Sequence, residues 1–109
     1  MKPLLLAVAL ALTPLASSAR GTTFAGVITD SECADANHAR MRMGDTDAEC
    51  VKACVDAHGA AFVLFDGKTT YALSDQKTPA ALAARKVIVT GTLDEKTRTI
   101  TVDSIVAAK

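Results

Sequence analysis

Residues 86–106 have the sequence KVIVTGTLDEKTRTITVDSIV. β-branched residues are frequent in both halves, 86–93 and 98–106, and apolar side chains alternate there with polar ones. Residues 94–97 are polar and separate the two halves. The stretch therefore predicts two antiparallel strands joined by a short turn. Gly91 stands inside the first of them, where a tightly coiled barrel strand needs a kink.

Three earlier segments also have strand character. Residues 22–29, TTFAGVIT, place alternate side chains on opposite faces, and Gly26 marks a bend or bulge. Residues 60–66, AAFVLFD, are apolar enough to be buried on both faces. They are followed by the hairpin signal Asp66-Gly67 and by residues 69–73, TTYAL. The chain is therefore expected to form five strands, with the second and third paired.

Two helices are expected between these strands. Thr46 and Glu49 form a capping box, in which Thr46 accepts the amide of residue 49 and Glu49 accepts that of residue 46. This helix covers residues 46–58, and Gly59 follows as a left-handed C-cap. A shorter helical turn opens at Thr78-Pro79 and reaches Ala84. The order predicts a mainly β fold, a five-stranded OB-like Greek-key barrel with one helix inserted between strands 1 and 2 and a short helix between strands 3 and 4.

Residues 1–19 have the features of a secretory signal peptide. A basic residue precedes the apolar run 4–12, and small residues lead to an expected cleavage site near Ala19. The run is much shorter than the roughly 20 residues of a membrane span. We therefore expect one domain, residues 20–109, with a cysteine-bearing insert at 30–58, located in the periplasm or outside the cell.

Composition excludes some functions. The chain has 12 basic and 12 acidic residues, and loss of the signal peptide removes only Lys2, which leaves a slightly negative domain. A nucleic-acid partner is therefore not expected. Tyr71 is the one aromatic residue suited to stacking on a ligand, because the other aromatics have the pattern of core residues. No phosphate loop or catalytic triad motif is present, so an enzyme is not expected.

The three cysteines are an odd number for an exported protein. Cys50 and Cys54 lie four residues apart on the predicted helix, where β-carbons are about 5–6 Å apart and too distant for a disulfide. Cys33 should therefore pair with one of them. The helical wheel favours Cys54, which falls beside Val51 and Val55, and places Cys50 at the rim as the spare thiol. A Cys33–Cys54 disulfide would stabilise the domain by about 3 kcal/mol.

A soft-metal site is the alternative interpretation of the same residues. Three thiols and an imidazole can form a tetrahedral zinc shell, and added thioethers would suit cuprous copper. The candidate ligands are Cys33, His38, Cys50, Cys54, His58, Met41 and Met43. A second alternative is a thiol–disulfide redox protein, with Cys50 in the first helical turn as the exchanging thiol. Asp30, Glu32 and Asp35 are expected to be turn and cap residues.

Four segments carry a resemblance to known proteins. They are GVITDSxC at 26–33, YxL at 71–73, KVxVTGTL at 86–93 and IxVxSI at 100–105. Together they resemble a group of small exported bacterial proteins of unassigned function, and the barrel half is similar to the periplasmic bacterial OB-fold family. The resemblance implies an OB-like fold and export, and it supplies no activity. The insert departs from the plain pattern of the periplasmic family.

These observations predict a small exported, non-catalytic binding or envelope-associated module. Its ligand is unknown, and its stability depends on the Cys33–Cys54 disulfide. The protein would be a monomer, or a dimer linked through the spare Cys50. A zinc or copper protein and a thiol–disulfide redox protein are the alternatives.

Overall fold

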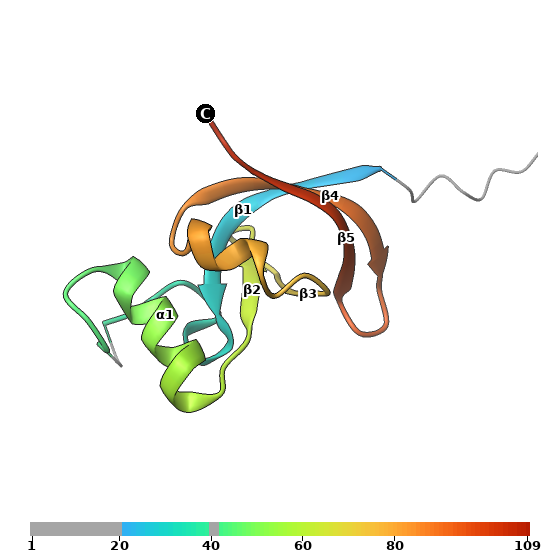
Figure 1. The fold of residues 1–109 in the computed structure, drawn as a ribbon. Helices are drawn as coiled ribbons and strands as arrows, with labels where there is room; N and C mark the ends of the chain where they lie inside the picture. The colour runs from blue at the N-terminus through green and yellow to red at the C-terminus, as the bar shows by residue number, and fades with distance from the viewer. Residues whose placement is uncertain (1–20, 40–41) are drawn as a thin grey trace, which may run out of the picture.

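The computed structural model describes residues 21–39 and 42–109 (Figure 1). The signal peptide predicted at residues 1–19 and the candidate ligand Met41 lie outside the described residues. Five strands form a closed barrel with one α-helix, which confirms the mainly β prediction. The elements are β1 (Thr22–Asp30), the 3-10 helix η2 (Ser31–Cys33), α1 (Asp47–His58), β2 (Phe62–Phe65), β3 (Thr70–Leu73), the 3-10 helix η3 (Thr78–Leu82), β4 (Lys86–Asp94) and β5 (Thr99–Ala107).

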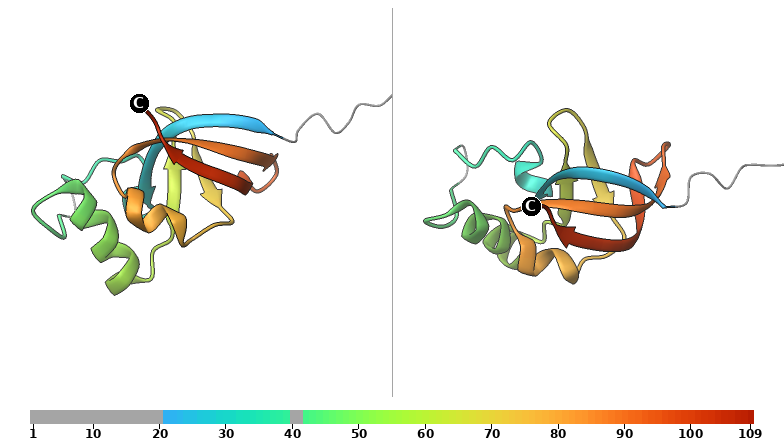
Figure 2. Two further views of the ribbon diagram at one scale, coloured as in Figure 1. Left: turned by 45° about the horizontal axis from the view of Figure 1, so that its top comes forward. Right: turned by 90° about the horizontal axis from the view of Figure 1, so that it is seen from above.

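The strands follow the order β1-β2-β3-β5-β4 around the barrel, and β4 pairs with β1 to close it. Both predicted antiparallel pairs, β2 with β3 and β4 with β5, are confirmed. The pair β3 and β5 is parallel, whereas all other pairs are antiparallel. Figure 2 shows β1, β4 and β5 side by side along one wall, with β2 and β3 forming the other.

Two glycines allow the strands to bend sharply enough to close the barrel. The first half of β1 pairs with β4 and the second half with β2, and Gly26 lies where the partner changes. A β-carbon on Gly26 would collide with the carbonyl oxygen of Phe65. Gly91 lies at a register shift between β4 and β5, and a β-carbon there would collide with the carbonyl oxygen of Thr101. Both predicted bends are therefore present.

The helix α1 begins and ends as the sequence predicts, with one change. The Thr46 hydroxyl accepts the Glu49 amide at 3.1 Å, but the Glu49 carboxylate accepts the amide of Asp45 rather than that of residue 46. Gly59 takes a left-handed conformation, φ 69°, and its amide donates to the carbonyl of Cys54. The helix lies beside the end of the barrel at which β1 terminates (Figures 1 and 2).

The core fills the barrel and includes one side chain of the helix. The second predicted helix is the five-residue 3-10 helix η3, and its Pro79 is buried. Among the described residues, no helix has the length and apolar character that crossing a membrane requires. The buried core cluster is Ile28, Val51, Phe62, Leu64, Leu73, Ala83, Val87, Val89, Ile100 and Ile105.

Candidate metal centre

The end of β1 holds Cys33 through its backbone. One carboxylate oxygen of Asp30, Oδ1, accepts the amides of Glu32 and Cys33 at 2.9 and 3.0 Å, so Asp30 is the N-cap of η2. The hydroxyl of the preceding Thr29 donates to the carbonyl of Cys33 at 2.8 Å. Thr29 and Asp30 are both fully buried. The peptide groups on both sides of the Cys33 α-carbon are therefore fixed by the strand that precedes it.

The loop after η2 turns back and buries His38. The amide of Ala36 donates to the carbonyl of Cys33 at 2.8 Å, and Ala36 is left-handed, with φ 62°. Such a conformation is uncommon outside glycine and persists where surrounding contacts determine it. The hydroxyl of Thr70 on β3 donates to the carbonyl of Ala34 and ties the loop to the barrel. His38 follows and is only 5% exposed.

The helix α1 supplies two buried cysteines. Cys50 and Cys54 are both 0% exposed, so the prediction that Cys50 lies at the rim is wrong. The helix is covered on two sides. Val51 packs into the barrel core, whereas Cys50 and Cys54 form a second buried cluster with Ala60, against which Met43 packs. A helical wheel assumes a single buried face, and here the loop between η2 and α1 provides another.

Three ligand-type side chains converge where the helix meets the loop. The sulfurs of Cys33 and Cys50 and a ring nitrogen of His38 all lie within 4.8 Å of one another, and all three residues are buried. His38 Nδ1 is buried without a hydrogen-bond partner. The amide of Met43 donates to Cys50 Sγ at 3.4 Å. This combination of two thiols, an imidazole and an N–H group directed at sulfur is suited to a thiophilic metal ion.

Cys54 lies next to this triad without belonging to it. Cys50 shares hydrogen bonds with the thiols of both Cys33 and Cys54. Burial, and then the charge of Asp30, raises the pKa of Cys33, and the same causes raise the pKa of Cys54 to about 12. A reactive cysteine needs the opposite shift, toward the thiolate. The surroundings therefore favour the protonated thiols of Cys33 and Cys54.

The remaining predicted site residues divide into two groups. Met43 is half-buried against Cys50 and Cys54. His58 is exposed in the last turn of α1 and does not join the triad, although it follows Cys54 at the same four-residue step. No disulfide joins any of the three cysteines, so the predicted Cys33–Cys54 disulfide is not present in the structure.

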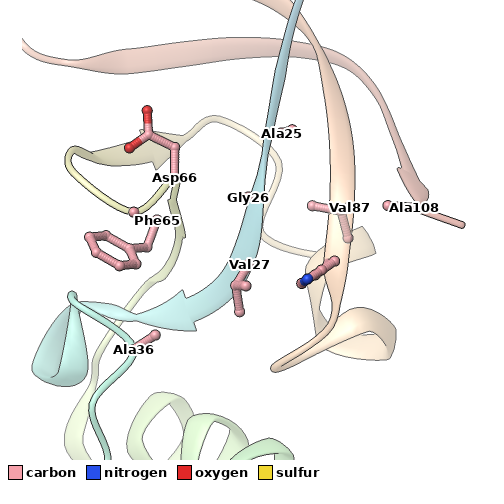
Figure 3. A pocket seen from close by; sticks show the side chains of 10 residues that line it. Ala25, Gly26, Val27, Ala36, Phe65, Asp66, Val87 and Ala108 are labelled. Atoms are coloured by element: carbon pink, nitrogen blue, oxygen red, sulfur yellow. The ribbon is translucent and has the colours of Figure 1, made fainter.

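Two hollows in the barrel wall lie outside the cysteine cluster. The first, of about 420 Å³, lies between β1, the end of β2 and β4, and Phe65, Val27 and Val87 line it (Figure 3). The second, of about 270 Å³, contains the predicted binding residue Tyr71 together with Arg98. Tyr71 is half-buried, and its ring lies 5.6 Å from that of Phe24. Neither hollow is lined by a cysteine or histidine.

No family model, curated protein or solved structure matches this chain. The site is therefore interpreted from its own geometry.

From the sequence, Asp30 was expected only to be a turn and cap residue. The structure confirms the cap and adds that Asp30 Oδ2 is buried without a hydrogen-bond partner. A signal for its burial was available, because Asp30 directly continues the strand pattern of residues 22–29 and stands three residues before a cysteine. Thr29 was placed on the strand face away from Ile28, and its bond to Cys33 had no sequence signal.

Proposed function

We propose that this protein is a small exported metal-binding module whose triad of Cys33, His38 and Cys50 binds one thiophilic ion. The convergence of the three ligand atoms within 4.8 Å in a buried place carries the proposal. The unpartnered Nδ1 of His38 supports it, because a buried polar atom without a partner costs free energy that an ion or proton would offset.

The donor set favours Zn²⁺ or Cu⁺. Thiolate and imidazole ligands select soft or borderline ions over Ca²⁺ and Mg²⁺, which prefer oxygen. Three protein ligands leave one position of a tetrahedral zinc shell open. Cys54 is the candidate for that position, because its thiol already contacts Cys50. Met43 would line the site with its thioether and its amide.

A redox function is the second candidate, and one observation favours it. The sulfurs of Cys33 and Cys50 lie within 4.8 Å of each other. A disulfide could therefore form between Cys33 and Cys50, whereas the helical wheel favoured Cys54 as the partner. The raised pKa values of Cys33 and Cys54 reduce the thiolate that both exchange and metal binding require, so they do not separate the two candidates. The metal site accounts for more of the geometry, because it uses the buried His38 as well as the two sulfurs.

We further infer an OB-like Greek-key barrel as the scaffold of this module. The strand order β1-β2-β3-β5-β4 and the parallel pairing of β3 with β5 support that inference. In this arrangement the metal site lies in the insert between β1 and β2. Export through the signal peptide at residues 1–19 remains part of the proposal.

Metal binding by the reduced protein tests the function. Residues 20–109 are purified anaerobically with a reductant, and the zinc content and a Co²⁺ titration are measured. We expect one ion per chain and a thiolate-to-cobalt charge-transfer band. Cys50→Ser should weaken binding by more than the roughly 10–100-fold that loss of an outer-shell partner costs.

The two histidines provide a matched control. His38→Asn should weaken binding as strongly as Cys50→Ser, whereas His58→Asn should leave it unchanged because His58 is exposed at the far end of α1. Equal effects of the two histidine variants would contradict the site. A native mass lower by two hydrogens, with no metal uptake after reduction, would favour the redox candidate instead.

A further inference from the structure

Asp30 is a buried carboxylate without a compensating cation. Its side chain is 0% exposed. Oδ1 accepts two backbone amides, whereas Oδ2 is buried and has no hydrogen-bond partner. No lysine or arginine in the described part of the chain forms an ion pair with it. Burial of an ionised carboxylate is costly unless an opposite charge compensates it, so a nearby cation would stabilise the buried Asp30.

The carboxylate acts on the metal centre from just outside it. The Asp30 carboxylate accepts a hydrogen bond from the amide of Cys33, and its charge raises the pKa of both Cys33 and Cys54. It does not belong to the set of ligand atoms within 4.8 Å. Among the described residues, the buried side-chain polar atoms without a partner are Asp30 Oδ2 and His38 Nδ1, at the two ends of one loop. Asp30 is therefore an outer-shell residue that contributes charge.

We propose that Asp30 makes the metal centre selective for a divalent thiophilic ion such as Zn²⁺ over the monovalent Cu⁺. This inference rests on the proposed function. With Cys33 and Cys50 as thiolates and Cys54 as a protonated thiol, the centre and Asp30 carry three negative charges. Zn²⁺ leaves one of them uncompensated and Cu⁺ leaves two. Because Coulomb attraction is proportional to the charge of the ion, removal of the Asp30 charge weakens Zn²⁺ binding more than Cu⁺ binding.

The test compares both ions in wild-type protein and in Asp30→Asn. Asparagine is an equally good N-cap, so Oδ1 can still accept the two amides while the charge is lost. Affinities are measured anaerobically by competition with a chromophoric chelator for Zn²⁺ and with a cuprous chelator for Cu⁺. Zn²⁺ affinity should fall by about 10–100-fold. Because Cu⁺ carries half the charge, its affinity should fall by about the square root of that factor, so the ratio of Zn²⁺ to Cu⁺ affinity should fall by about 3–10-fold.

Asp35→Asn is the matched control, because it removes the same charge from the same loop. Asp35 is exposed, and its charge raises the pKa of Cys33 less than the charge of Asp30 does, so the affinity ratio should stay within about twofold of wild type. If Asp30→Asn fails to fold, Asp30→Ser keeps a capping oxygen and serves the same comparison. An unchanged ratio in the neutral variant would overturn the role of Asp30 alone. Wild-type protein that binds neither ion would overturn the proposed function itself.

Discussion

Val51→Ala should separate the helix from the barrel and thereby weaken the metal centre. Val51 is the fully buried side chain that α1 places in the core, and Ala48 and Val55 pack against the core from partly buried positions. The substitution removes two methyl groups, each worth about 0.8 kcal/mol of transfer free energy. The cavity left in a closed barrel adds to this, so we expect a loss of about 2–3 kcal/mol. In a domain of this size that corresponds to a fall in Tm of roughly 10–20 °C.

Equilibrium unfolding in urea, with a chelator and a reductant present, measures this loss. Val55→Ala is the matched control on the same helix, because Val55 is only half-buried and should lose about 1 kcal/mol or less. Addition of Zn²⁺ should restore part of the Val51→Ala stability, because an ion that joins α1 to η2 binds only the docked helix. Equal losses in the two variants, or no effect of zinc, would refute this account of how the helix is held.

Two further substitutions test the supports of the fold. Thr29→Val should cost about 0.5–1.5 kcal/mol, because it removes the hydroxyl that donates to the carbonyl of Cys33 while the Ala36 amide still donates to that carbonyl, and it should also lower metal affinity in a chelator competition. Bonds from the Thr78 side chain and amide and from the Lys77 amide lower the pKa of Asp75. Its contribution to stability is therefore present above the unfolded pKa of about 3.9 and is lost as the pH falls through the lower folded value. Asp75→Asn should flatten the acid limb of a stability–pH curve, and a curve parallel to wild type would contradict this.

The barrel could be predicted largely from local patterns. Alternation identified β1, β4 and β5, whereas the apolar run at residues 60–66 identified β2. Asp66-Gly67 identified the turn into β3, and Thr46 identified the start of α1. These signals are local because strand burial and helix capping depend on neighbouring residues. Gly26 and Gly91 were also interpretable, since a glycine inside a strand usually marks a close approach of backbone.

The arrangement of the cysteines could not be predicted in the same way. The helical wheel identified the face that carries Val51, but the environment of Cys50 is set by the loop that contains Cys33 and His38. That loop has no periodicity, and its path depends on Thr29, Asp30 and the left-handed Ala36. Tertiary contacts of this kind have no signature in spacing, which is why the sequence did not show that Cys33, His38 and Cys50 lie together.

The proposed metal site would also link metal occupancy to oxidation state. A disulfide between Cys33 and Cys50 would use two of the three converging ligands, so the oxidised chain could not retain the ion at this place. An ion bound to both sulfurs would in turn withhold them from an oxidant. In the proposed site two of the three cysteines are ligands, so the odd number of cysteines does not require a disulfide. In this proposal, Cys33 and Cys50 determine whether a metal ion or a disulfide forms. Cys54 can be a fourth ligand or a packing residue without changing that outcome.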